Sequence, residues 1–209
     1  MKIFYYDLSS YLIEKKVERK KLQSALGRYI VSFVAKTVYG VEDTEIIIEN
    51  KKPKFLNSQL CFNISHSNNI VAVAFDDYSI GFDVECMKDR DYKAISQYLK
   101  VNLNNKKEFY QYWTQYEAKI KIQDEVKQIL CFELCKDYMC SLFSSNPDEG
   151  MNTKLKIYEL ISPIESISPI ELINLNPVNA NNKNENTLVA QERNTASVDF
   201  LTPLALKTE

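Results

Sequence analysis

The spacing of apolar residues changes along the chain, and this change limits the folds that the chain can adopt. Between residues 14 and 36, apolar side chains recur every three or four positions, which predicts one amphipathic helix ending near Gly40. Short apolar runs of strand length follow, and a second helical pattern extends over residues 104–122. Helices combined with several short strands indicate an α+β fold.

The positions of the short runs predict two β-hairpins. Residues 71–75 and 80–85 flank the turn-forming tetrapeptide Asp-Asp-Tyr-Ser, and residues 129–134 and 138–143 flank a second short turn. Residues 154–160 are expected to add a strand to this second hairpin.

The composition of the chain changes after residue 161. Residues 174–209 are predicted to form a flexible tail, because residues 174–194 are rich in asparagine and poor in large apolar side chains. The last apolar patch, residues 200–206, is expected to dock on the body of the protein.

The overall composition excludes several functions. The chain has 26 basic and 28 acidic residues, a balance that argues against a general nucleic-acid or membrane-surface binder. No apolar run approaches the ~18 residues of a membrane span, and the N-terminal apolar start is too short for a signal peptide. A cytoplasmic protein is therefore expected. Four glycines are too few and too scattered for a glycine-rich phosphate loop, and one histidine excludes a multi-histidine zinc site.

The cysteines do not form a common zinc motif. Cys131, Cys135 and Cys140 are separated by three and four residues, which matches no usual zinc-binding pair. We expect buried thiols in a reducing compartment, with a metal or redox role as the alternative.

The segment Gly81-Phe-Asp83-Val-Glu85 contains the strongest candidate for a metal site. Alternate residues of a strand share a face, so Asp83 and Glu85 are predicted to point the same way. Two converging carboxylates repel each other unless a cation lies between them, and hard oxygen ligands select Mg²⁺ or Mn²⁺. The alternative is a pair of solvated acids.

Two further segments carry residues suited to the same chemistry. Trp113, Glu117 and Lys121 recur every four positions and share one helix face, although an ordinary ion pair between Glu117 and Lys121 is the alternative. The segment F-N-I-S-H-S at 62–67 ends in Ser65 and His66. These neighbours point to opposite sides of an extended chain and lack a G-x-S-x-G setting, so phosphate binding fits better than serine hydrolysis.

These three segments, in this order, resemble the signature blocks of the 4′-phosphopantetheinyl transferases, most closely the surfactin-synthetase-activating (Sfp-type) group. The blocks are F-N-I-S-H-S at 62–67, G-F-D-V-E at 81–85 and W-x-x-x-E-A-x-x-K at 113–121. Lys52-Pro53 resembles the family's G-K-P element, and Leu26-Gly27-Arg28 resembles a stretch of its first helix. The resemblance covers residues 20–160.

The resemblance implies a fold of two pseudo-symmetric halves, each a helix packed on a small antiparallel sheet. Residues 1–80 are then expected to form the N-terminal α+β half, and residues 81–173 the C-terminal α+β half that carries a metal site. It implies a monomeric enzyme that transfers the 4′-phosphopantetheine group of coenzyme A to a serine of an apo acyl or peptidyl carrier protein, releasing adenosine 3′,5′-bisphosphate. It also implies the roles of the site residues. Asp83, Glu85 and Glu117 would hold Mg²⁺ (or Mn²⁺), Glu117 would be the general base, Lys121 would neutralise phosphate and protonate the leaving group, and Arg28, Lys52, Ser65 and His66 would bind coenzyme A.

The chain departs from the family pattern in three places. Tyr116 replaces the lysine that usually precedes the helical glutamate, the segment between the second and third blocks is short, and the glycine-containing loop after the helix is absent. These departures motivate one alternative, a non-catalytic relative that binds a carrier protein or coenzyme A without turnover. An unrelated Mg²⁺-dependent phosphatase or nuclease is a second alternative, but it would not share the block at 62–67.

Overall fold

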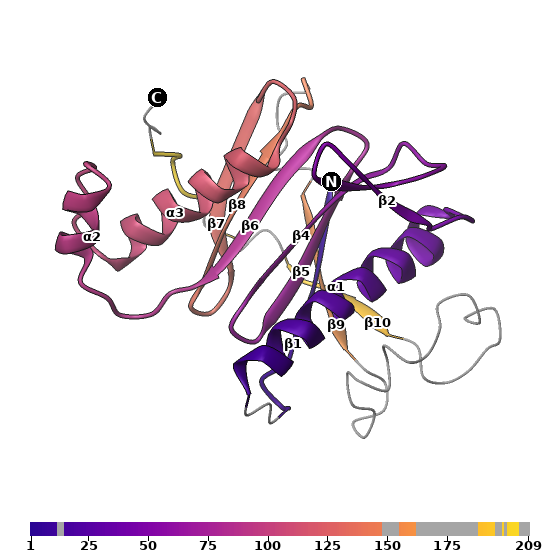
Figure 1. Ribbon diagram of the computed structural model, residues 1–209, viewed down its shortest axis with the longest axis horizontal. Coiled ribbons are helices and arrows are strands. Elements are labelled where there is room, and N and C mark those ends of the chain that lie inside the picture. The colour runs from indigo at the N-terminus through magenta and orange to yellow at the C-terminus, as the bar shows by residue number, and fades with distance from the viewer. Residues whose placement is uncertain (12–14, 148–154, 162–187, 195–197, 199, 205–209) are drawn as a thin grey trace. The chain divides into compact units, whose positions relative to one another are not determined.

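The computed structural model describes residues 1–11, 15–147, 155–161, 188–194, 198 and 200–204 (Figure 1). The fold is α+β, as predicted. The chain forms two compact units, one of Met1–Asp77 with Leu155–Thr195 and the other of Tyr78–Lys154 with Ala196–Glu209. Within the described ranges, no helix has the length and apolar composition that crossing a membrane requires.

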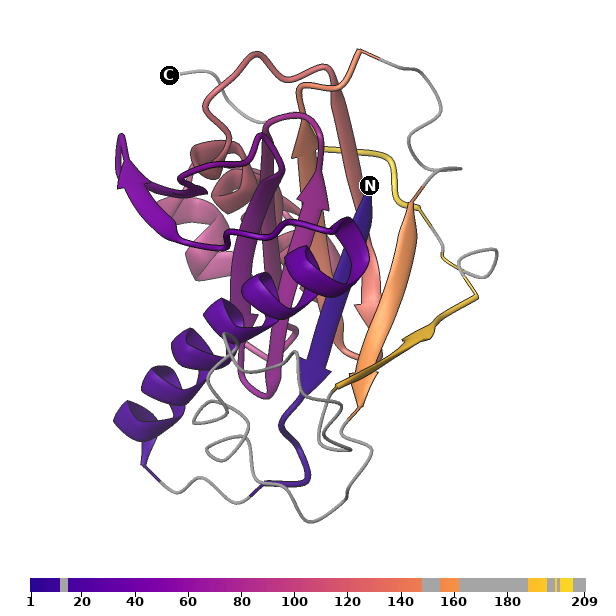
Figure 2. The same cartoon turned by 90° about the vertical axis from the view of Figure 1, so that its right-hand side faces the viewer.

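The first unit is built on a five-stranded sheet in the order β10-β9-β1-β5-β4, with α1 lying across one face (Figure 2). Every neighbouring pair is antiparallel except β1 and β9, which are parallel, so this sheet is mixed rather than purely antiparallel as expected. A separate hairpin is formed by β2 and β3. The elements are β1 (Lys2–Asp7), α1 (Lys16–Tyr39), β2 (Ile46–Glu49), β3 (Lys52–Phe55), β4 (Cys61–Ser67), β5 (Ile70–Asp76), β9 (Lys156–Ile161) and β10 (Val189–Glu192).

The apolar stripe of α1 forms the core of this unit. Leu26, Ile30 and Val34 are fully buried against the sheet, in one cluster with the side chains of β1, β4 and β5. Gly40 ends the helix in the left-handed conformation (φ 68°), and its N–H donates to the carbonyl of Ala35. The predicted helix and its glycine stop are confirmed.

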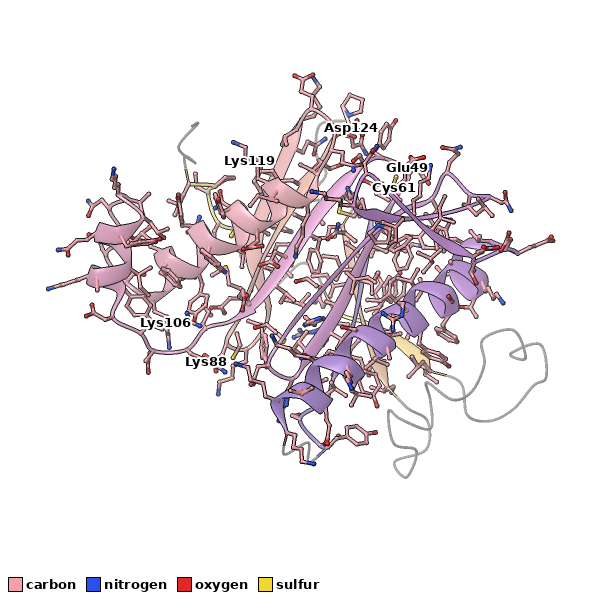
Figure 3. All side chains as sticks on the ribbon, viewed as in Figure 1. Glu49, Cys61, Lys88, Lys106, Lys119 and Asp124 are labelled. Atoms are coloured by element: carbon pink, nitrogen blue, oxygen red, sulfur yellow. The ribbon has the colours of Figure 1, made fainter. Side chains whose placement is uncertain are left out.

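The second unit is a three-stranded antiparallel sheet in the order β6-β8-β7, against which α3 packs (Figure 1). The side chain of Asn105 caps α3 by accepting the Glu108 N–H at 3.0 Å. The elements are β6 (Ile80–Cys86), α2 (Tyr92–Tyr98), α3 (Lys106–Lys121), β7 (Gln128–Cys135) and β8 (Tyr138–Ser144). Figure 3 labels Lys106 at the start of α3 and Lys119 near its end.

One of the two predicted hairpins is confirmed, and the other is wrong. Strands β7 and β8 pair antiparallel around a tight turn with Asp137 at φ 63°. Strands β5 and β6 do not pair, because β5 lies between β1 and β4 whereas β6 pairs with β8. The tetrapeptide between them spans the boundary between the two units instead of reversing the chain within one sheet.

The placement of the third C-terminal strand is also corrected. Strand β9 does not extend the β7–β8 hairpin but pairs parallel with β1, with Lys2 opposite Lys156. Residues 155–161 therefore belong to the first unit, although the predicted boundaries assigned them to the C-terminal half.

Most of the predicted flexible tail, residues 174–209, lies outside the described residues. Within the described part, β10 forms an antiparallel pair with β9, which a flexible tail would not do. The docking of the last apolar patch is confirmed for residues 200–204 within the second unit. The Leu201 N–H donates to the carbonyl of Cys131 at 2.7 Å, and the Phe200 ring meets Phe132 edge-on.

Gly81 lets β6 lie directly against the last turn of α3. A Cβ at this position would come within 2.0 Å of the Ala118 carbonyl oxygen and 2.8 Å of the Ile122 backbone nitrogen. Both are backbone atoms, so no side-chain movement relieves the overlap. Any side chain at position 81 would therefore push the helix away from the strand.

We predict that Gly81→Ala lowers the free energy of unfolding of the second unit by about 3 kcal/mol, because overpacking against backbone forces the helix to move. Urea unfolding followed by the fluorescence of Trp113, the single tryptophan, measures this. The control is Gly27→Ala in the first unit, where an added Cβ meets a side-chain methyl of Ile64 at 2.7 Å; because this methyl can move, the urea midpoint of the Trp113 signal should stay unchanged in this variant. An unchanged urea midpoint for Gly81→Ala would contradict the close packing.

Candidate functional site around Asp83 and Lys121

Asp83 and Glu85 lie on the face of β6 that α3 covers. The missing Cβ of Gly81 points at the Ala118 carbonyl of α3, and strand alternation puts residues 83 and 85 on the same face as residue 81. Phe82 and Val84 are fully buried on the opposite face. The predicted shared face of the two acids is therefore present, and a helix lies directly over it.

Lys121 provides the positive charge beside Asp83. Its ammonium Nζ donates to Asp83 Oδ1 at 2.7 Å and to the backbone carbonyl of Phe82 at 3.1 Å. The Asp83 side chain is 6% exposed and that of Lys121 is 28% exposed. A carboxylate with so little solvent contact needs a paired cation, because an uncompensated buried charge is costly.

Glu117 lies one turn before Lys121 on α3 and is partly exposed. The same helix carries a row of stacked aromatic rings, with Trp113 between Phe109 (6.4 Å between ring centroids) and Tyr116 (6.0 Å). Tyr116, which precedes Glu117 directly, is 44% exposed.

A buried hydroxyl pair also fixes α3 on the sheet. The hydroxyls of Thr114 on α3 and Ser141 on β8 lie 2.7 Å apart, and Ser141 is the strand partner of Asp83. Both side chains are fully buried. Sequence reasoning missed this contact, because nothing in the local pattern around either residue indicates a polar partner on a distant element.

The donor set at this position matches a hard divalent ion in chemistry. The carboxylates of Asp83 and Glu85 share one strand face, and Glu117 lies on the helix that packs against it. Carboxylate oxygens are the ligands that Mg²⁺ prefers. In the part of the chain that the structure describes, no three His, Cys, Asp or Glu side chains are grouped closely enough to hold a metal ion. The cation at Asp83 Oδ1 is the Lys121 ammonium, with which an ion at that oxygen would compete.

The other predicted site residues lie in the first unit. Ser65 and His66 are both on β4, which continues to Ser67, so their side chains point to opposite faces of the sheet. This arrangement does not support a serine–histidine hydrolytic pair. Arg28 is exposed on α1, and Lys52 begins β3 opposite Glu49.

The first turns of α1 are rich in basic residues, and one of these residues has a structural role. Arg19 Nη1 donates to the side-chain oxygen of Asn69 at 2.8 Å, and Gln23 Nε2 donates to the carbonyl of Asn68 at 2.7 Å. These bonds attach the helix to the turn between β4 and β5. The neighbouring Lys20 and Lys21 are exposed, as a solvated face requires.

The five cysteines are all free thiols. Cys131 and Cys140 are buried, whereas Cys61, Cys86 and Cys135 are partly exposed, so the prediction of buried thiols holds for two of them. Burial raises the pKa of both the Cys131 and the Cys140 thiol. A raised pKa keeps these thiols protonated and therefore unreactive.

No protein-family model matches the chain, and no curated protein matches it significantly. The transferase resemblance therefore depends on the three residue blocks themselves. The structure places them on β4, β6 and α3, and it brings the second and third blocks into direct contact through Asp83 and Lys121.

We predict that Lys121→Met and Asp83→Asn each lower the free energy of unfolding by about 2 kcal/mol, because each leaves a partly buried partner without its counterpart. The double variant should lose less than the sum of the two single losses. Urea unfolding followed by Trp113 fluorescence measures the cycle. Lys119→Met, an exposed lysine on the same helix turn, is the control and should cost almost nothing. Strictly additive losses would show that the two side chains do not interact.

Proposed function

We propose that the chain transfers the 4′-phosphopantetheine group of coenzyme A to a serine of an apo acyl or peptidyl carrier protein. The observation that supports this most strongly is the contact between β6 and α3, in which Asp83 of one block lies 2.7 Å from Lys121 of another. We also propose that the two units, with α1 on one sheet and α3 on the other, are the pseudo-symmetric halves of a transferase fold acting as a cytoplasmic monomer.

The chemistry follows from the residues of the helix and strand. The carrier serine Oγ attacks the phosphorus that bears the pantetheine arm, Glu117 accepts the serine proton, and the bond from that phosphorus to the bridging oxygen breaks. Adenosine 3′,5′-bisphosphate leaves, with Lys121 neutralising its phosphate and supplying a proton. Such a reaction depends on charge neutralisation and positioning more than on a covalent nucleophile.

Asp83, Glu85 and Glu117 would hold the Mg²⁺ ion that this chemistry uses. When bound, Mg²⁺ supplies charge neutralisation at the pyrophosphate. In the first unit, Arg28, Lys52 and His66 have at least partly exposed side chains that suit the coenzyme A phosphates, and Ser65 is proposed as a further donor despite being 5% exposed.

The alternative function is binding of a carrier protein or coenzyme A without turnover. Two observations favour it: Tyr116 removes one positive charge from the helix, and Lys121 contacts the acid that would hold the metal.

The direct test mixes the protein with Mg²⁺, fluorescent coenzyme A and several apo carriers, and detects carrier labelling by mass spectrometry. We expect labelling to fall at least about 100-fold in Asp83→Asn and Glu117→Gln, because each removes charge at the reacting phosphates. The matched control is Asp124→Asn, an exposed carboxylate beyond the end of α3 that Figure 3 labels. Coenzyme A binding without labelling of any carrier would favour the binding-only alternative, and labelling that survives Asp83→Asn would contradict the assigned site.

A second test concerns the departure at position 116. If the missing cation limits turnover, Tyr116→Lys should raise the labelling rate by about tenfold, since one added charge near the phosphates is worth about 1.4 kcal/mol. Tyr116→Gln is the control, because it also removes the ring stacked on Trp113 but adds no charge. Equal rates for the two variants would remove this explanation.

A further inference from the structure

We propose that Lys121 is an internal competitor of the divalent ion, so that an ion binds Asp83 only by displacing the Lys121 ammonium. This inference rests on the proposed function, because it concerns the metal site of that reaction. It assigns Lys121 a second role, that of a residue that sets the metal affinity of the site. Binding of the ion and release of the lysine would then be one event.

The contact geometry supports competition for a single oxygen atom. The Lys121 ammonium lies 2.7 Å from Asp83 Oδ1 and is also held by the Phe82 carbonyl at 3.1 Å. A divalent ion bound to the same carboxylate oxygen would have to lie a few ångströms from this ammonium. Like charges at that separation repel strongly in a partly buried site, so the two cations exclude each other.

Burial makes the competition effective. The Asp83 side chain is 6% exposed, so solvent screens its charge poorly and one cation must remain beside it. The Lys121 side chain is 28% exposed and extends from the last residue of α3, which leaves it a route toward solvent when an ion takes its place.

Displacement would also prepare the lysine for its proposed role. While it is paired with Asp83, the Lys121 charge is neutralised and does not act on a phosphate. With an ion bound to the Asp83 carboxylate, the Lys121 ammonium would be available to a phosphate near the same site. Lys121 would therefore rest on Asp83 while no ion is bound and would be available to the leaving group when one is.

The test measures Mn²⁺ binding to the whole chain by electron paramagnetic resonance, in which bound Mn²⁺ loses the signal of the free ion. We expect Lys121→Met to bind Mn²⁺ about tenfold more tightly than the unmodified protein, because the competing cation is gone. Lys121→Arg retains the charge and should restore the weaker binding. Lys121→Gln, which keeps hydrogen-bond donors toward Asp83 and Phe82 but carries no charge, tests the same point if Lys121→Met folds poorly.

Lys119→Met is the matched control, because it removes one charge from an exposed position on the same helix turn. Equal tightening in both Met variants would overturn the proposal, since it would reveal only a change in net charge. Equal affinity in the unmodified protein and in Lys121→Met and Lys121→Gln would overturn the competition but leave the metal site intact. A lack of Mn²⁺ binding in every variant would overturn the competition together with the proposed metal site.

Discussion

The close approach of β6 to α3 is the constraint on which the candidate site depends. Gly81 permits it, because any Cβ there would overlap the backbone of the helix. This approach buries Asp83 beneath α3 and brings it within reach of a lysine in the last helical turn. A buried carboxylate needs a cation, and in this structure that cation is the Lys121 ammonium.

Much of the local structure could be predicted from the sequence. The three-to-four-residue spacing predicted both long helices, and Gly40 marked the end of the first. Strand pairing was predicted correctly only for β7 and β8, which a tight turn joins. Alternation indicates which residues share a face but does not select the neighbouring strand. The parallel partner of β1 comes from more than 150 residues along the chain, and no local pattern indicates it.

In the candidate site, too, positions within one strand or helix could be predicted, whereas contacts between elements could not. Alternation correctly placed Asp83 and Glu85 on one strand face, and helical spacing placed Glu117 and Lys121 one turn apart. The contact between Asp83 and Lys121, 38 residues apart, and that between Thr114 and Ser141 were not predictable. Both depend on how the helix docks on the sheet, which is a tertiary property.

The most direct test of whether Lys121 leaves Asp83 when a divalent ion is present is the reactivity of the Lys121 amine. Amine labelling with an acylating reagent, read by peptide mass spectrometry with and without Mg²⁺, reports whether the lysine remains on Asp83, and exposed Lys119 serves as the internal reference. We predict slow labelling of Lys121 without Mg²⁺, and faster labelling with Mg²⁺ that approaches the rate in Asp83→Asn. Labelling of Lys121 that is as fast as that of Lys119 without Mg²⁺, or that does not change when Mg²⁺ is added, would contradict this prediction.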